Sequence, residues 1–195
     1  MKWARGVHHL TELARQVAEL PSSFSRLRVV ELWAVGELLG APRDLDTIEV
    51  AVVVDLPEVP WLTEPVGAEH WANATRASRN PIVLFWRSAT GPVWNHHIER
   101  PVLVWSAAGG VVEEARAALA DGTGERLRPP APTESELAER LADELSVSLA
   151  ALRRAAAAYE ERRWAPGKLT PLSDALWRTS TGYLELYDAR ARLAV

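Results

Sequence analysis

The residues best suited to chemistry lie close together in the stretch WAVGELLGAPRDLDTIEVAVVVD, residues 33–55. Two glycines, Gly36 and Gly40, come before a run of valines, and three acidic residues lie between them and that run: Asp44, Asp46 and Glu49. Backbone N–H groups at a glycine turn can bind phosphate oxygens, and nearby carboxylates can bind the divalent metal that phosphoryl or nucleotidyl transfer requires. The stretch predicts either such a site or a strand-turn-strand whose carboxylates face water.

The order of a strand, Gly36, a connection, acidic residues and a hydrophobic strand resembles the minimal nucleotidyltransferases of the DNA polymerase beta type. Their signature is a strand, Gly-Ser or Gly-Gly, a connection, and then Asp-hydrophobic-Asp/Glu-hydrophobic. Gly36 matches the glycine, whereas Glu37 stands where the serine or second glycine would be, and its carboxylate would repel a triphosphate. Aligning the valine run places Thr47 and Glu49 on the acidic pair, so only Glu49 is acidic there.

Two other registers remain open. Asp44 and Asp46 have the acidic spacing but precede the strand, and Asp46 could instead pair with Glu49 across a bulge. The third carboxylate of the family comes from a later strand; the segment RPVLVW contains no acid, and Glu99 is the nearest candidate. The resemblance therefore implies catalytic roles for Asp46 and Glu49, Mg²⁺ as cofactor bound by Asp46, Glu49 and Glu99, and ligand contacts from Gly36, Glu37 and Arg76.

The segment WNHHIER, residues 94–100, contains two adjacent histidines that could act as metal ligands or as an acid–base group. Adjacent residues in an extended segment point to opposite sides, so at most one of His96 and His97 would join a given site. Polar loop side chains with local hydrogen bonds are the favoured interpretation. Arg76 and Arg79, three residues apart on a predicted helix, could bind phosphate or face water.

Hydrophobic periodicity predicts the elements that would position these residues. Apolar spacing predicts helices over residues 3–20, 67–79 and 111–121, and runs of β-branched and aromatic residues predict strands over 27–35, 48–54, 82–86 and 102–105. The valine run of 48–54 indicates a central strand covered on both faces. This order predicts an α/β (α+β) layer, and the resemblance implies a nucleotidyltransferase-like mixed sheet with flanking helices.

The C-terminal third has a different pattern. A capping-box signature at Thr133 and Glu136 precedes leucines at close to helical spacing, and a second long apolar pattern follows the break APGKLTP. The sequence therefore predicts an α/β domain over residues 1–122, a linker over 123–132 and an antiparallel helical pair over 133–195.

Composition limits the class of protein. The net charge is −4 and the isoelectric point about 5.8, which gives no general attraction to nucleic acids or acidic membranes. The chain has no cysteine, so disulfides and thiolate ligands are excluded, and its first residues carry charges where a signal or anchor would be apolar. These features predict a cytoplasmic protein, and abundant Ala, Arg, Glu and Pro are typical of high-GC bacterial genomes.

Two functions follow as hypotheses. One is a nucleotidyltransferase-like protein that binds a nucleotide or small phosphate ligand, with at most residual Mg²⁺-dependent nucleotidyl transfer. The other is a non-catalytic interaction or regulatory protein that uses its helical pair or its tryptophans to bind a protein partner or a second copy of itself. The degenerate acidic pattern favours a protein without catalysis.

Overall fold

The computed structural model describes residues 1–21 and 26–193, and the chain forms two compact units. The first unit comprises residues 1–57 and 64–131, and the second comprises residues 58–63 together with the chain from Pro132 onward. Residues 123–131, expected as a linker, thus belong to the first unit, and a short piece of the expected α/β domain belongs to the second.

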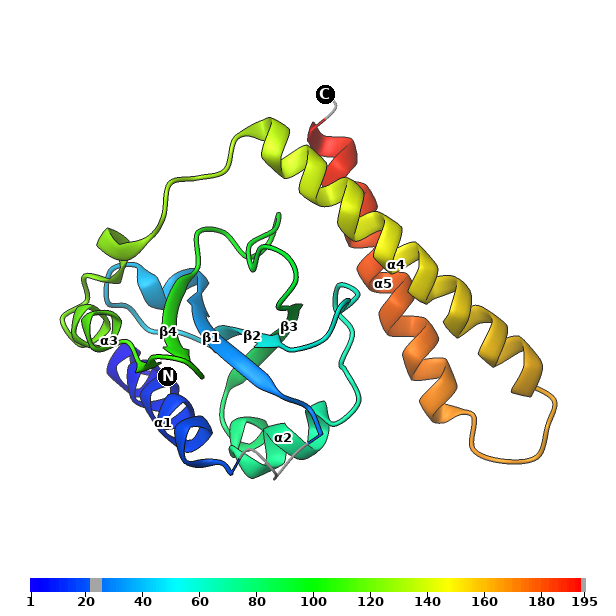
Figure 1. Ribbon diagram of the computed structural model, residues 1–195, viewed down its shortest axis with the longest axis horizontal. Coiled ribbons are helices and arrows are strands. Elements are labelled where there is room, and N and C mark those ends of the chain that lie inside the picture. Colours follow the sequence, from blue (N-terminus) through cyan, green and yellow to red (C-terminus); the bar gives the residue numbers. More distant parts are fainter. Residues whose placement is uncertain (22–25, 194–195) are drawn as a thin grey trace. The chain divides into compact units, whose positions relative to one another are not determined.

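The first unit is built on a five-stranded mixed sheet (Figure 1). Its strands are β1 (Val29–Val35), β2 (Ile48–Val54), β3 (Ile82–Ser88), β4 (Val102–Ser106) and β5 (Gly110–Val111), in the order β3-β2-β1-β4-β5. β2 and β3 are parallel, whereas β1 is antiparallel to both of its neighbours. The valine run therefore forms an interior strand of the sheet, as the sequence predicts.

The strand register separates two faces of this sheet. Glu49 of β2 lies opposite Val35 of β1 and Val83 of β3, so these three side chains share one face. Ala51 and Val53 continue that face, which we call the Glu49 face. The alternate residues of β1 and β2 point to the other face and are almost entirely buried: Leu32, Ala34, Val50, Val52 and Val54.

Two helices cover the face opposite Glu49. α1 (Trp3–Glu19) lies on this face because its Gly6 closely approaches Ile48 of β2. α2 (Ala68–Ala74) lies on the same face because its Trp71 contacts Trp86 of β3. These two rings meet edge to face, with their centroids 5.4 Å apart. α3 (Glu113–Ala120) contacts both β4 and α1. Short 3₁₀ helices complete the unit: η1 (Gly36–Leu39), η2 (Ala77–Arg79) and η3 (Gly124–Leu127).

The second unit is an antiparallel helical pair, α4 (Glu134–Arg162) and α5 (Thr170–Leu193). Residues 58–63 lie against this pair through Trp61, whose indole is 2 % exposed. Ser148 of α4 accepts a hydrogen bond from the Trp61 backbone N–H at 3.3 Å, and Glu185 of α5 accepts one from the indole Nε1 at 3.1 Å. Gly182 of α5 contacts the Trp61 carbonyl so closely that no Cβ would fit there.

The predicted fold class, a mixed α/β sheet followed by a helical pair, is confirmed. The long capped helix begins one residue after Thr133, where the capping box places it. Among the helices of the described residues, none combines the length and the apolar character that a membrane span requires.

Candidate functional site

The glycine turn predicted to hold phosphate lies at the end of β1, where Gly36 begins η1 with a φ of +67°. This left-handed conformation favours glycine. A Cβ at Gly36 would lie 2.5 Å from Oε2 of Glu49, on the neighbouring strand. The resemblance pairs this turn with Glu49, and the two are in direct contact. The close approach of Glu49 is therefore a second reason, besides the positive φ, why position 36 has no side chain.

Glu49 faces a histidine of the segment WNHHIER. The side chain of Glu49 is 33 % exposed, and its Oε1 lies 3.7 Å from Nε2 of His97. The His97 ring contacts Phe85 of β3 at a centroid distance of 4.8 Å, and Asn95 accepts hydrogen bonds from the backbone N–H groups of His97 and Ile98. Of the two histidines, His97 thus joins the Glu49 face.

The loop that carries His97 is fixed to the sheet by a buried cation. Arg87 of β3 lies opposite Val53 and so points to the Glu49 face, where it is 2 % exposed. Its guanidinium donates hydrogen bonds to the carbonyls of Pro92 and Trp94, at 3.4 and 3.5 Å. The loop between β3 and β4 therefore covers part of this face.

Arg128 reaches the Gly36 turn from the segment after η3. It donates hydrogen bonds to the carbonyl oxygens of Gly36, at 2.8 Å, and Glu99, at 3.0 Å, and it pairs with Glu125 at 2.7 Å. The side chain of Arg128 is only 12 % exposed, so these contacts hold its guanidinium in one position.

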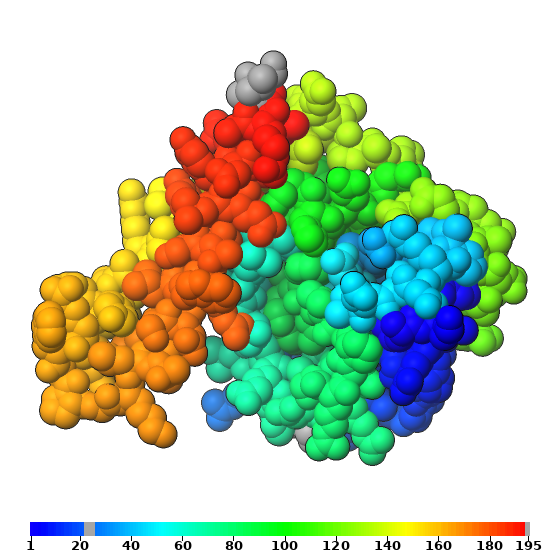
Figure 2. Space-filling model, turned by 180° about the vertical axis from the view of Figure 1, so that it is seen from behind, coloured from blue at the N-terminus to red at the C-terminus, as the bar shows by residue number. Residues whose placement is uncertain are grey.

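A pocket of about 410 Å³ lies at the same turn. Gly36, Glu37, Gly40, Ala41, Arg43 and Arg128 line it. Figure 2 shows the segment around residue 40 (light blue) beside the start of α1 (dark blue). An ion pair between Asp44 and Lys2, at 3.2 Å, connects the two. The pocket joins glycine backbone to two guanidinium groups, a combination suited to anions.

The other predicted site residues lie at varied distances from this turn. Glu37 is exposed and pairs with Arg43, and Asp46 is exposed in the loop before β2. Glu99 is exposed, and the bond it makes to Arg128 uses its backbone carbonyl rather than its carboxylate. Arg76 follows α2, which covers the opposite face of the sheet, and it does not line the pocket.

The residues implied as Mg²⁺ ligands do not form a metal-binding set in the structure. Two strands flank β2: β3, which contains no acid, and β1, whose Glu31 lies opposite Val53, four residues along β2 from Glu49. β4, the strand nearest to Glu99 in sequence, lies on the far side of β1. Across residues 1–21 and 26–193, no three His, Asp or Glu side chains are grouped closely enough to hold a metal ion. The residues present do not fit the implied Mg²⁺.

The sequence pattern did not indicate the two arginines of the pocket. Arg128 stands before the prolines of RPPAP, which favoured its assignment to a linker, and Arg43 stands in an irregular loop after Pro42. Their proximity to Gly36 depends on tertiary contacts from residues far along the chain.

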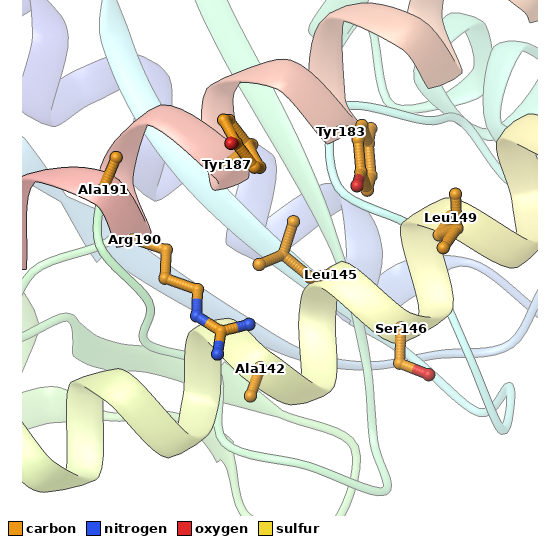
Figure 3. A pocket seen from close by; sticks show the side chains of 8 residues that line it. All are labelled: Ala142, Leu145, Ser146, Leu149, Tyr183, Tyr187, Arg190 and Ala191. Atoms are coloured by element: carbon orange, nitrogen blue, oxygen red, sulfur yellow. The ribbon is translucent and has the colours of Figure 1, made fainter. Parts of the chain in front are cut away.

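The helical pair carries a second concave surface, a groove of about 560 Å³ between α4 and α5 (Figure 3). The rings of Tyr183 and Tyr187 of α5 lie 6.5 Å apart over Leu145 and Leu149 of α4, with an angle of 28° between the ring planes. Arg190 extends toward α4 beside them. The remaining lining residues are Ala142, Ser146 and Ala191. This groove is mainly apolar and aromatic.

Comparison with known proteins identifies a family for this chain. No curated protein and no solved structure matches the chain. The family model described as a domain of unknown function, DUF7711, matches residues 1–192, nearly the whole chain. The chain therefore belongs to the DUF7711 family.

Proposed function

We propose that the first unit binds the phosphate group of a nucleotide or a small phosphate ligand in the pocket at Gly36. One observation carries this proposal: Arg43 and Arg128 line the same pocket of about 410 Å³ as the glycine turn between β1 and β2. The contact of that turn with Glu49 also supports the likeness to nucleotidyltransferase-like domains.

The two arginines would contribute differently. Arg128 is held by two carbonyls and Glu125, so little side-chain entropy remains to be lost when an anion binds. Arg43 pairs with Glu37, and their side chains are 59 % and 61 % exposed, respectively. An ion pair this exposed contributes little free energy, so a phosphate can displace the Glu37 carboxylate from Arg43.

The proposal is for binding without transfer. Glu49 is the one acidic side chain of β2, and its neighbour β3 offers none, so the paired carboxylates that hold two catalytic metal ions are missing from these strands. The side chain that lies 3.7 Å from the Glu49 carboxylate is His97 and not a second carboxylate. Affinity would come from arginine and backbone contacts.

Calorimetric titration of the full chain tests this proposal. The ligands are the four ribonucleoside triphosphates and inorganic pyrophosphate, each with and without Mg²⁺. We expect binding without Mg²⁺, weakened about tenfold or more in Arg43→Gln because one charge-assisted contact is lost. Glu37→Gln should instead strengthen binding, because it removes the carboxylate that competes for Arg43.

The matched control is Arg116→Gln, which removes the same charge from an exposed ion pair on α3, outside the pocket. It should leave affinity unchanged. Absence of heat with every ligand, or an equal loss in Arg116→Gln, would refute phosphate binding at Gly36. Binding that requires Mg²⁺ and is lost in Glu49→Gln would point instead to retained metal chemistry.

A second candidate function has its own observation in the helical pair. Trp177, Leu184 and Tyr187 are 67 %, 57 % and 57 % exposed, and their spacing of seven and three residues places them on one side of α5, next to the groove. An apolar stripe on a two-helix hairpin is commonly buried by a second hairpin in a four-helix bundle. We propose a second copy of this chain as the occupant, related by a two-fold axis.

Light scattering coupled to gel filtration tests self-association on the full chain. We expect a dimer whose mass falls to that of the monomer in Leu184→Glu, with an unchanged far-ultraviolet circular dichroism spectrum. Ala107→Glu adds the same charge at an exposed position of the first unit and should remain dimeric. A monomeric parent protein at concentrations of tens of micromolar would refute this function.

A further inference from the structure

The first unit contains a second and larger pocket, of about 690 Å³, that neither function above uses. It lies on the part of the Glu49 face formed by β1 and β4, under the loop that Arg87 holds. Leu103 of β4 forms part of its floor beside Trp33 of β1, and residues of the loop, of α3 and of the segment after η3 form its walls. Small-molecule sites typically measure about 300–1,000 Å³, so this pocket has the size of a small-ligand site.

Two indoles and two carboxylates give the pocket its chemical character. Trp33 and Trp94 line it, and both are half-buried. Glu31, two residues before Trp33 on β1, and Glu114, in the first turn of α3, supply the carboxylates. Among the described residues that line this pocket there is no lysine, arginine or histidine.

The Glu31 carboxylate is fixed by the protein. The indole Nε1 of Trp33 donates a hydrogen bond to Oε2 of Glu31 at 2.8 Å. This bond uses the one polar atom of the indole and leaves Oε1 of Glu31 available to a ligand. Within the described part of the chain, no ion pair joins Glu31 or Glu114 to a basic side chain. The guanidinium groups of Arg87 and Arg100 bond to backbone carbonyls of lining residues, namely Pro92, Trp94 and Pro129.

We propose that this pocket binds a small organic cation, an alkylammonium or guanidinium compound, between the indoles of Trp33 and Trp94 and the carboxylates of Glu31 and Glu114. Indole faces attract cations through the ring quadrupole, and more strongly where water is excluded. The two carboxylates disfavour anionic ligands, and the apolar lining from Val93, Val102, Leu103 and Val112 suits the alkyl part. This inference does not depend on phosphate binding at Gly36.

Calorimetric titration with an isosteric pair tests the requirement for positive charge. Choline carries the charge, and 3,3-dimethyl-1-butanol has the same shape without it; ethylguanidine serves as a planar cation. We expect choline or ethylguanidine to bind and the neutral alcohol to bind at least about tenfold more weakly. Failure of both cations to bind at concentrations up to tens of millimolar, or equal binding of the alcohol, would overturn the proposal.

Variants then locate the site. Glu31→Gln keeps the acceptor for Trp33 but removes the charge, and it should weaken binding about tenfold or more. Glu113→Gln removes the same charge one residue before Glu114, from a side chain that pairs with Arg116 and does not line the pocket. It should leave binding unchanged, and an equal effect of the two variants would reject this pocket as the site.

Indole resonances report where the cation binds. In a ¹H–¹⁵N spectrum of the full chain, the cation should shift the Nε1–H signals of Trp33 and Trp94, each assigned by its loss in the Phe variant. The signals of the buried Trp61 and Trp71 should not move. Shifts confined to indoles other than Trp33 and Trp94 would contradict the proposed site.

Discussion

Gly36 shows how one residue satisfies two constraints at the proposed phosphate pocket. Its φ of +67° requires the left-handed region, and its missing side chain makes room for Oε2 of Glu49. The two effects are separable, because only the second depends on the Glu49 side chain. Glu49 is thus an immediate structural neighbour of the turn, whatever it contributes to ligand binding.

Replacing Gly36 by alanine should destabilise the protein by about 1–3 kcal/mol, the sum of left-handed backbone strain and displacement of Glu49. In a Glu49→Ala background the same replacement should cost less, by at least about 0.5 kcal/mol, because only the backbone strain remains. Urea denaturation of the four proteins of this double-mutant cycle measures the difference. Equal costs in the two backgrounds would show that the turn and Glu49 are not in contact.

At the residue scale, the sequence predicted what local chemistry determines. The sequence predicts a turn at Gly36 because glycine tolerates that conformation, and the resemblance pairs this turn with Glu49; the register of β1 and β2 brings the two together. The approach of His97 to Glu49 and of Arg128 to Gly36 spans loops whose path no local pattern encodes. For this reason the sequence predicts Glu99 as a metal ligand and Arg76 as a ligand contact, whereas Arg43 and Arg128 line the pocket.

Among the elements, α4 shows the clearest agreement between sequence and structure. The Thr133 hydroxyl accepts a hydrogen bond from the Glu136 backbone N–H, and the Glu136 carboxylate accepts one from the Thr133 backbone N–H at 2.7 Å. The Thr133 hydroxyl also donates a hydrogen bond to Oε2 of Glu136, at 2.8 Å. The two bonds that the carboxylate accepts, first from the Thr133 backbone N–H and second from the Thr133 hydroxyl, lower the pKa of Glu136 below its ordinary value. The carboxylate form is therefore favoured in the folded state.

This shift predicts the direction of a pH effect. A carboxyl group whose pKa is lower when folded contributes stability that is complete above its unfolded pKa and is lost as the pH falls through its folded pKa. Glu136→Gln keeps an acceptor for the Thr133 N–H but does not titrate. Between about pH 5 and about pH 3 the parent protein should lose stability relative to this variant, as thermal melts at several pH values would show. A difference that is constant across this range would contradict the prediction.

The elements that the sequence missed are short or depend on distant partners. β5 has only two residues and pairs with β4 at Trp105 and Ser106, so it has no periodicity to detect. η3 lies in a proline-rich segment that was expected as a linker, yet its Gly124 is buried and packs closely against Leu39. By contrast, the valines of β2 are buried on both faces, and such a strand leaves a continuous apolar run in the sequence.

At the scale of the whole molecule, the second unit depends on a segment from the middle of the chain. Trp61 is buried against the helical pair, with hydrogen bonds to Ser148 and Glu185, and Gly182 contacts its carbonyl. The neighbouring Leu62 has a φ of +57°, a left-handed conformation that is uncommon for a leucine. The sequence assigns Trp61 to the predicted α/β domain of residues 1–122, whereas in the structure it belongs to the second unit.

Gly182→Ala tests this arrangement. Alanine normally stabilises a helix relative to glycine by about 0.5–1 kcal/mol, but here the Cβ would collide with the Trp61 carbonyl, so we expect a net loss of about 1–3 kcal/mol. Hydrogen exchange should quicken in residues 58–63, α4 and α5, and remain unchanged in β1 to β4, because the strands belong to the other unit. A stabilised variant, or faster exchange in the strands, would contradict this assignment.

The Trp61 segment also sets an order for biosynthesis. A ribosome delivers Trp61 well before its partners, which follow 87 residues later at Ser148 and 124 residues later at Glu185. The strands of the first unit can pair before α4 and α5 are available to bury Trp61. The nascent chain therefore exposes the Trp61 indole until α5 has emerged. In the finished protein, a protease that cuts between Arg128 and Thr133 breaks the direct connection to α4, but the helical pair stays attached through Trp61.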